Sequence, residues 1–334
     1  MMPDLPEIPI LALIFAALMG AAILAYVVLD GYDLGVGMLM PAATEEEQSV
    51  MVASIGPFWD ANETWLVLGV GLLLVGFPAA HGVILQALYL PAAAMLIGLM
   101  LRGVAFEFRM KAQGWHRELW NWLFWAGSFL ASFSQGVMLG RWITGFQPGA
   151  GYWLFALVVG ASLCGGYVLL GAAWLVIRTE GELQKKSLGW ARWGLLWVAL
   201  GVGAVSLMTP LASETVRERW FDFPRTLWLM LLPAACLVAG ARLWILAGRM
   251  QRGEKLHEWS LFLHAAIIFT LAFAGLAWSM FPWLVLDRID IWQTAHPSAL
   301  WVILWGAVLV LPFILAYNVL AYRIFKGKAR ENLY

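Results

Sequence analysis

The feature that most constrains this chain is a series of long apolar runs with almost no charge. The first, from Pro9 to Leu29, contains no charged residue. The 334 residues are 62% hydrophobic and 13% charged, whereas a soluble domain is about half apolar and about a quarter charged. Such a chain must use the lipid bilayer as its solvent. Because the runs are continuous rather than alternating, they indicate transmembrane helices rather than barrel strands.

Nine segments are long enough to cross the hydrocarbon core, which takes roughly 20 apolar residues. The expected spans are 9–38, 55–77, 82–106, 118–140, 152–177, 191–213, 225–247, 258–282 and 299–322. The loops between them are too short for a separate soluble domain. We therefore predict an all-α polytopic membrane protein with a single integral membrane domain over 1–334. Residues 1–150 and 151–285 would form two four-helix bundles, and 286–334 a last peripheral helix with a cytoplasmic tail.

Lys and Arg are unevenly divided between the two sets of loops. Sixteen of the 21 fall on the side that holds the C-terminal tail. The five on the other side are Arg141, Arg217, Arg219, Arg225 and Arg288. Because basic loops stay in the cytoplasm, this places the N-terminus outside and the C-terminus inside. Residues 1–7 have no basic cluster, so we expect no cleaved signal peptide. The loop around Thr44 to Ser54 would be cytoplasmic.

Two acidic residues stand near the end of the first apolar run. Asp30 and Asp33 are three residues apart, so they share a helix face. Gly31 and Gly35 form a small-xxx-small pair that allows close approach of another helix. Carboxylates inside a membrane are energetically costly and indicate a functional site by default. The alternative is that both acids reach the cytoplasmic interface and only snorkel or cap.

A second acidic motif opens the next run. Pro57 suits the first turn of a helix, Asp60 and Glu63 share a face, and Thr64 lies one turn after Asp60. One interpretation is a helix cap, since carboxylates at an N-terminus are stabilised by the helix dipole. The other is a proton-uptake site, in which these groups hold water on the cytoplasmic side. The predicted topology puts the carboxylates of both motifs near that side.

Arg102 and Glu107 belong to the third run. Arg102 falls inside a predicted span and needs a partner, and Glu107 lies at the cytoplasmic end of the same helix. Either can pair with the carboxylates of the first two runs. A structural ion pair and a proton relay both fit this pattern.

The histidines test for haem, because a bis-His haem needs two imidazoles at one membrane depth. The chain has His81, His116, His257, His264 and His296, of which only His264 is clearly inside a span. We expect this chain to bind no haem and no metal directly. Cys164 and Cys236 lie in apolar segments and are expected to pack as small side chains. A net charge of zero and the absence of nucleotide motifs give no indication of nucleic acid or nucleotide binding.

These motifs resemble subunit II of the cytochrome bd quinol oxidase family. The similarity rests on 29–39 (LDGYDLGVGML), 55–60 (IGPFWD), 102–109 and 127–129, with weaker matches at 178–183, 280–282 and Leu333-Tyr334. They follow the family order over nearly the whole chain. Residues 59–65 (WDANETW) resemble the cyanide-insensitive branch, whereas other members differ at Asn62-Glu63.

The resemblance implies a respiratory heterodimer in the bacterial cytoplasmic (inner) membrane. Subunit I would carry the b haems, haem d and the quinol-oxidising loop, and this chain would carry none. The complex would oxidise quinol and reduce O2 to water with cytoplasmic protons. The family assigns the aspartate that matches Asp60 to a proton path at the subunit interface, and the resemblance extends this role to Asp30, Asp33 and Glu107. Family members can hold a structural quinone or lipid in this subunit, and a small single-helix accessory subunit is a further partner.

Two other functions remain open. A secondary transporter or ion channel would use the same carboxylates to bind a cation, and a purely structural partner would have every acid at an interface. Transporters carry broken helices in matching halves. Here the acids concentrate in the first third of the chain, with no matching cluster in the second half. The leading prediction is therefore an oxidase subunit that has no catalytic residue of its own and is not catalytic alone.

Overall fold

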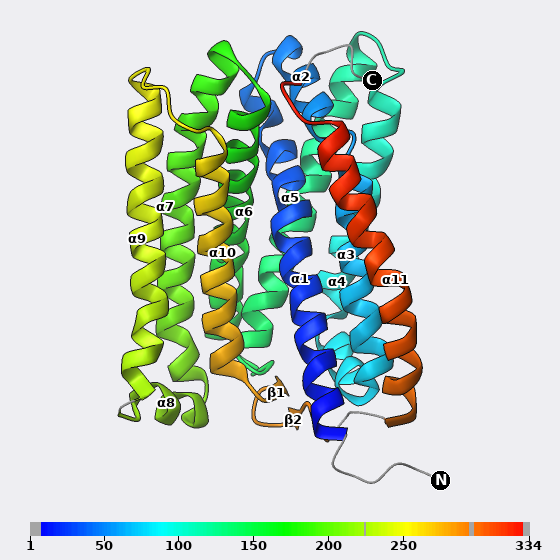
Figure 1. Ribbon diagram of the computed structural model, residues 1–334, viewed down its shortest axis with the longest axis vertical. Helices are drawn as coiled ribbons and strands as arrows, with labels where there is room; N and C mark the ends of the chain where they lie inside the picture. Colours follow the sequence, from blue (N-terminus) through cyan, green and yellow to red (C-terminus); the bar gives the residue numbers. More distant parts are fainter. Residues whose placement is uncertain (1–7, 224, 294–296, 330–334) are drawn as a thin grey trace.

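The computed structural model describes residues 8–223, 225–293 and 297–329, and these are almost entirely helical (Figure 1). In chain order the elements are α1 (Ile8–Leu39), η1 (Met40–Ala42), α2 (Glu45–Ile55), α3 (Trp59–Gly76), α4 (Pro78–Arg109), α5 (Trp115–Ile143), α6 (Ala150–Arg178), α7 (Gly181–Ala212), α8 (Glu214–Phe221), α9 (Arg225–Gln251), α10 (Trp259–Met280), β1 (Trp283–Val285), β2 (Ile289–Asp290) and α11 (Pro297–Ile324). The N-terminal residues 1–7, His296 and Leu333-Tyr334 lie outside the described residues.

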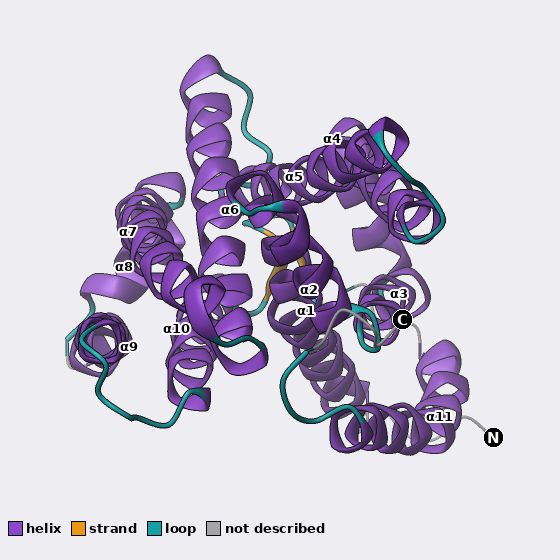
Figure 2. Cartoon of the chain, turned by 90° about the horizontal axis from the view of Figure 1, so that it is seen from above, coloured by secondary structure: helices purple, strands orange, loops and turns teal. Residues whose placement is uncertain are grey.

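Successive long helices run in opposite directions through one layered bundle (Figure 1). The short helix α2 lies at one end of it, which we call the α2 end. The antiparallel β1–β2 pair lies at the opposite end, which we call the hairpin end. Seen along the helices, α1, α5 and α6 occupy the middle, with α7 and α9 to one side and α3, α4 and α11 to the other (Figure 2).

The expected all-α membrane fold is confirmed. Among the described residues, seven helices are long and apolar enough to cross a membrane: α1, α4, α6, α7, α9, α10 and α11. The pair α2 and α3, bent by 52°, makes an eighth candidate if it counts as one span. The one expected span not counted here is 118–140, which lies in α5. This helix is 29 residues long, and its buried face carries the polar side chains of Ser128, Ser132 and Gln135.

The segment from Thr44 to Ser54, expected to be a loop, is mostly the helix α2. A capping box starts it. The Thr44 hydroxyl accepts a hydrogen bond from the Glu47 amide (3.3 Å), and the Glu47 carboxylate accepts one from the Thr44 amide (2.8 Å). The helix ends at Ile55, and the chain turns before α3 begins at Trp59. Pro57 therefore precedes α3 instead of lying in its first turn.

Helices α1 and α6 cross in very close contact. A Cβ atom added to Gly35 would overlap the backbone carbonyl of Tyr167, and one on Gly171 would lie 2.5 Å from the Gly35 backbone. A Cβ on Gly31 would lie 2.8 Å from the Tyr167 ring. The close approach expected from the Gly31/Gly35 pair is confirmed, and it fixes α1 against the centre of the molecule.

Replacing Gly35 by Ala should therefore force α1 and α6 apart. We expect a loss of about 1–3 kcal/mol in the free energy of unfolding, as for other overpacked cores. The measurement is the thermal unfolding midpoint of the protein purified in detergent. Gly203→Ala in α7 is the matched control, because a Cβ there meets nothing within 4 Å. A Gly35→Ala midpoint equal to that of Gly203→Ala would contradict the tight crossing.

Candidate functional site

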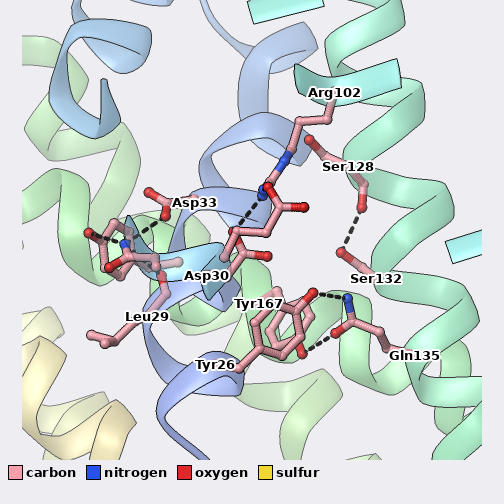
Figure 3. A network of polar contacts seen from close by, with 12 residues as sticks. Tyr26, Leu29, Asp30, Asp33, Arg102, Ser128, Ser132, Gln135 and Tyr167 are labelled. Atoms are coloured by element: carbon pink, nitrogen blue, oxygen red, sulfur yellow. Dashed lines mark hydrogen bonds and ion pairs between the residues drawn. The ribbon is translucent and has the colours of Figure 1, made fainter. Parts of the chain in front are cut away.

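A group of charged side chains is buried where α1, α3 and α4 meet, about two to three helical turns from the α2 end (Figure 3). Arg102 of α4 lies at its centre. Its Nη1 donates to Asp30 Oδ1 of α1 at 2.7 Å, and its Nη2 donates to Glu63 Oε2 of α3 at 3.2 Å. The Asp30 side chain is 0% exposed and that of Glu63 is 28% exposed. The Arg102 guanidinium thus bridges α1, α3 and α4. Its contacts extend from the buried Asp30 to the partly exposed Glu63.

Asp33 is buried on the same helix but has different partners. Asn62 Nδ2 donates to Asp33 Oδ2 and to the Tyr32 hydroxyl, both at 2.8 Å. The Tyr32 and Tyr322 hydroxyls are 2.8 Å apart, and Tyr322 donates to Asn62 Oδ1 at 3.2 Å. Asn62 therefore links the first helix with the last, across 260 residues of sequence from Tyr322. We call Asp30, Asp33, Asn62, Glu63 and Arg102 the carboxylate cluster.

A second set of buried hydrogen bonds continues from α1 toward the middle of the bundle. Gln135 of α5 donates from Nε2 to the Tyr26 hydroxyl at 2.7 Å, and the Tyr167 hydroxyl of α6 donates to Gln135 Oε1 at 2.6 Å (Figure 3). All three side chains are buried. Polar contacts thus run from the α2 end into the region where α1, α5 and α6 meet.

The carboxylate cluster has more acidic than basic groups. It contains three carboxyl groups and one guanidinium. Asp33 Oδ1 is buried with no hydrogen-bond partner among the described residues. A buried carboxylate oxygen without a donor leaves part of the negative charge uncompensated. The cluster therefore contains a buried carboxyl oxygen that no donor of the described residues covers.

Asp60, Thr64 and Glu107 lie outside the carboxylate cluster, with exposed side chains. The Thr64 hydroxyl donates to the backbone carbonyl of Ala61 at 2.6 Å. Glu63 lies one helical turn after Asp60 and reaches Arg102. The same side of α3 therefore carries one exposed acid and one half-buried acid. Sequence reasoning placed all the acids near one end, but only Asp30, Asp33 and Glu63 lie in the cluster.

The structure adds polar residues that the sequence did not single out. Tyr26, Tyr32, Gln135, Tyr167 and Tyr322 each sit in a long apolar run. Polar side chains within the apolar runs were the available signal, since such a side chain must find a partner inside the protein.

None of the described histidines and cysteines takes part in the hydrogen bonds of the carboxylate cluster. His264 Nδ1 is 2.7 Å from the Ser260 carbonyl. His81, expected in a link between helices, lies in the first turn of α4, because that helix begins at Pro78. Cys164 and Cys236 are free thiols. In the described part of the chain, no group of three or more His, Cys, Asp or Glu is arranged to hold a metal.

Comparisons with known proteins agree with the sequence motifs. The model of a family described as cytochrome bd terminal oxidase subunit II matches residues 11–325. The chain is similar to cytochrome bd-I ubiquinol oxidase subunit 2 of Escherichia coli (strain K12), at 30% identity with 97% of each chain covered. It is also similar to cytochrome bd ubiquinol oxidase subunit 2 of Bacillus subtilis (strain 168), at 35% identity over 52% of this chain and 55% of the relative.

The fold itself has a solved counterpart. The bd oxidase from Geobacillus thermodenitrificans matches with a TM-score of 0.75 and 15% sequence identity, covering 94% of this chain and 98% of that one. Because the family match extends over nearly all of the sequence, this chain belongs to the cytochrome bd terminal oxidase subunit II family.

Proposed function

We propose that this subunit, within a quinol-oxidising and O2-reducing complex, supports a haem-bearing subunit I and delivers cytoplasmic protons to it. The observation that carries the proposal is the carboxylate cluster, in which two acids share one arginine and a third buried acid, Asp33, is bound by Asn62. Reduction of O2 to water consumes protons, and a membrane-embedded site can receive them only through titratable groups or water. The subunit is then a partner in the reaction and not catalytic alone.

The proposed proton route enters at the surface that bears Asp60. Glu63 connects that surface with the interior, because its side chain is 28% exposed while it also pairs with Arg102. Asp30 and Asp33 are the buried acids beyond it. Thr64 and Glu107 are exposed groups that can hold water or protons near the entrance. Arg102 has a structural role, because it holds the carboxylates of Asp30 and Glu63 in place.

We also propose that α5 crosses the membrane as a ninth span. It is as long as α6, 29 residues, and its polar side chains face inward. The helices then form two four-helix bundles over 1–150 and 151–285, with α11 peripheral. The basic loops and tail gather at the α2 end, so this end would face the cytoplasm, the N-terminus the outside, and the complex would lie in the bacterial inner membrane.

The remaining partners follow from the family. Subunit I would hold the b haems and haem d, and a quinone or lipid could serve as a structural ligand in this chain. A small single-helix accessory subunit would bind the same complex. The transporter or ion channel has no support from the comparisons, because every relative named above is an oxidase.

Replacing Asp60 by Asn should slow quinol-driven O2 consumption and leave the haem content of the purified complex near normal. The Asp60 side chain is exposed, so Asn keeps its shape while removing the titratable group. We expect a loss of about a hundredfold, the lower end of the usual contribution of a proton-transfer group. The measurement combines an oxygen electrode with a visible haem spectrum.

The matched control for Asp60→Asn is Glu118→Gln, which removes another exposed carboxyl group from the first turn of a helix. It should keep wild-type turnover. Wild-type turnover in assembled Asp60→Asn enzyme would refute the proton route, and loss of haem would assign Asp60 a structural role instead.

Replacing Arg102 by Met should destabilise the protein, because Asp30 would remain buried without a countercharge. Breaking a buried ion pair from one side costs about 3–5 kcal/mol. The thermal unfolding midpoint of the detergent-solubilised complex measures this loss. Adding Asp30→Asn to Arg102→Met should restore most of the midpoint while turnover stays low. An unchanged midpoint in Arg102→Met alone would show that the pair has no structural part.

A further inference from the structure

A second polar site lies far from the carboxylate cluster, between α7 and α9 on the side of the bundle opposite α11 (Figure 1). It is an open pocket of about 420 Å³, lined by Arg192, Trp244, Ile245, Gly248, Gln251 and Arg252. Four of these residues belong to the last two turns of α9, near the α2 end. The lining contains two arginines and no acidic residue.

Arg192 is held in place but its charge has no countercharge. Its guanidinium carbon lies 3.8 Å from the centroid of the Trp244 ring, and its Nη1 donates to Gln251 Oε1 at 3.1 Å. Its Nε is buried and has no hydrogen-bond partner among the described residues. Among the described residues, no carboxylate lies within ion-pair distance of Arg192. The geometry leaves a positioned guanidinium whose charge is not matched by an acid, as in arginine sites for phosphate and carboxylate.

Arg252 lies at the outer rim of the same pocket and is only partly neutralised. Its Nη2 is 3.4 Å from Glu254 Oε1, while Arg249 Nε is 2.6 Å from the other oxygen of that carboxylate. Two arginines therefore share one acid in this loop. The pocket keeps a net positive charge after this acid is counted.

The surface beside the pocket is apolar. Ile245 is 57% exposed, and on α7 the side chains of Trp193 and Trp197 are 68% and 46% exposed. Such residues face lipid tails in a membrane protein, and exposed Trp is typical of the headgroup boundary. The two arginines thus lie at the depth where a bilayer carries its phosphate groups. A free anion would use the arginines but would gain nothing from this apolar surface.

We propose that this pocket binds an anionic phospholipid. The phosphodiester would accept hydrogen bonds from the guanidinium groups of Arg192 and Arg252, and the acyl chains would lie along Ile245 and Trp197. Basic pockets between transmembrane helices recognise lipid headgroups in this way. The proposal is independent of the proton route, because no residue of the carboxylate cluster lines the pocket.

The test is native mass spectrometry of the delipidated oxidase complex, titrated with phosphatidylglycerol or with phosphatidylcholine of the same acyl chains. Arg192→Gln should weaken phosphatidylglycerol binding by about fivefold, since one arginine near a membrane surface contributes about 1 kcal/mol. Trp244→Ala should weaken it in the same direction, because the Arg192 guanidinium loses the ring on which it rests. Phosphatidylcholine should bind more weakly and show no dependence on Arg192.

The matched control is Arg323→Gln, which removes an exposed arginine from the last turn of α11 on the far side of the molecule. It should leave phosphatidylglycerol binding unchanged. Equal binding by Arg192→Gln and Arg323→Gln would overturn the proposal. So would equal affinity of the wild-type complex for the two lipids. Displacement of phosphatidylglycerol by inorganic phosphate would also overturn it, because the pocket would then select a free anion.

Discussion

The ion pair between Arg102 and Asp30 is the constraint around which the interior is arranged. A guanidinium and a carboxylate that are both nearly inaccessible cannot be left without partners in a medium that offers no water. The pair therefore requires α1 and α4 to stay together, and Glu63 adds α3 to the same contact. Desolvation offsets much of the attraction, so the intact pair adds little net stability, whereas loss of one partner would leave a buried charge uncompensated.

The same short stretch of α1 also determines how the helix packs. Asp30 and Asp33 face polar groups of α3 and α4, whereas Gly31 and Gly35 face α6 so closely that an added Cβ would meet its backbone. Because successive helical residues are turned by about 100°, acids and glycines in one stretch can serve two faces. A change that shifts α1 on α6 would therefore also shift both carboxylates relative to Arg102 and Asn62.

The spacing of residues along the predicted helices was enough to predict part of the site from the sequence. It indicated that Asp30, Asp33 and Glu63 gather at one end and that Arg102 requires a partner. Spacing could not show that Asp60 faces outward, because the rotation of α3 depends on what it packs against. It also could not supply Tyr322, which reaches Asn62 from the last helix. The capping box of α2, with Thr44 and Glu47 three residues apart, lies in a segment between two apolar runs that was expected to be a loop.

The donors around the carboxylates bear on what the site can bind. Asp30 and Glu63 both face the Arg102 guanidinium, and Asp33 faces the amide nitrogen of Asn62. A site for a metal cation directs several oxygens at one empty position, whereas here N–H donors occupy those positions. The countercharge of Asp30 and Glu63 is the Arg102 side chain, which is covalently part of the protein and does not exchange with solution as a bound cation does. The smallest charge such a cluster can still exchange is a proton, on a carboxyl oxygen that no donor covers, such as Asp33 Oδ1.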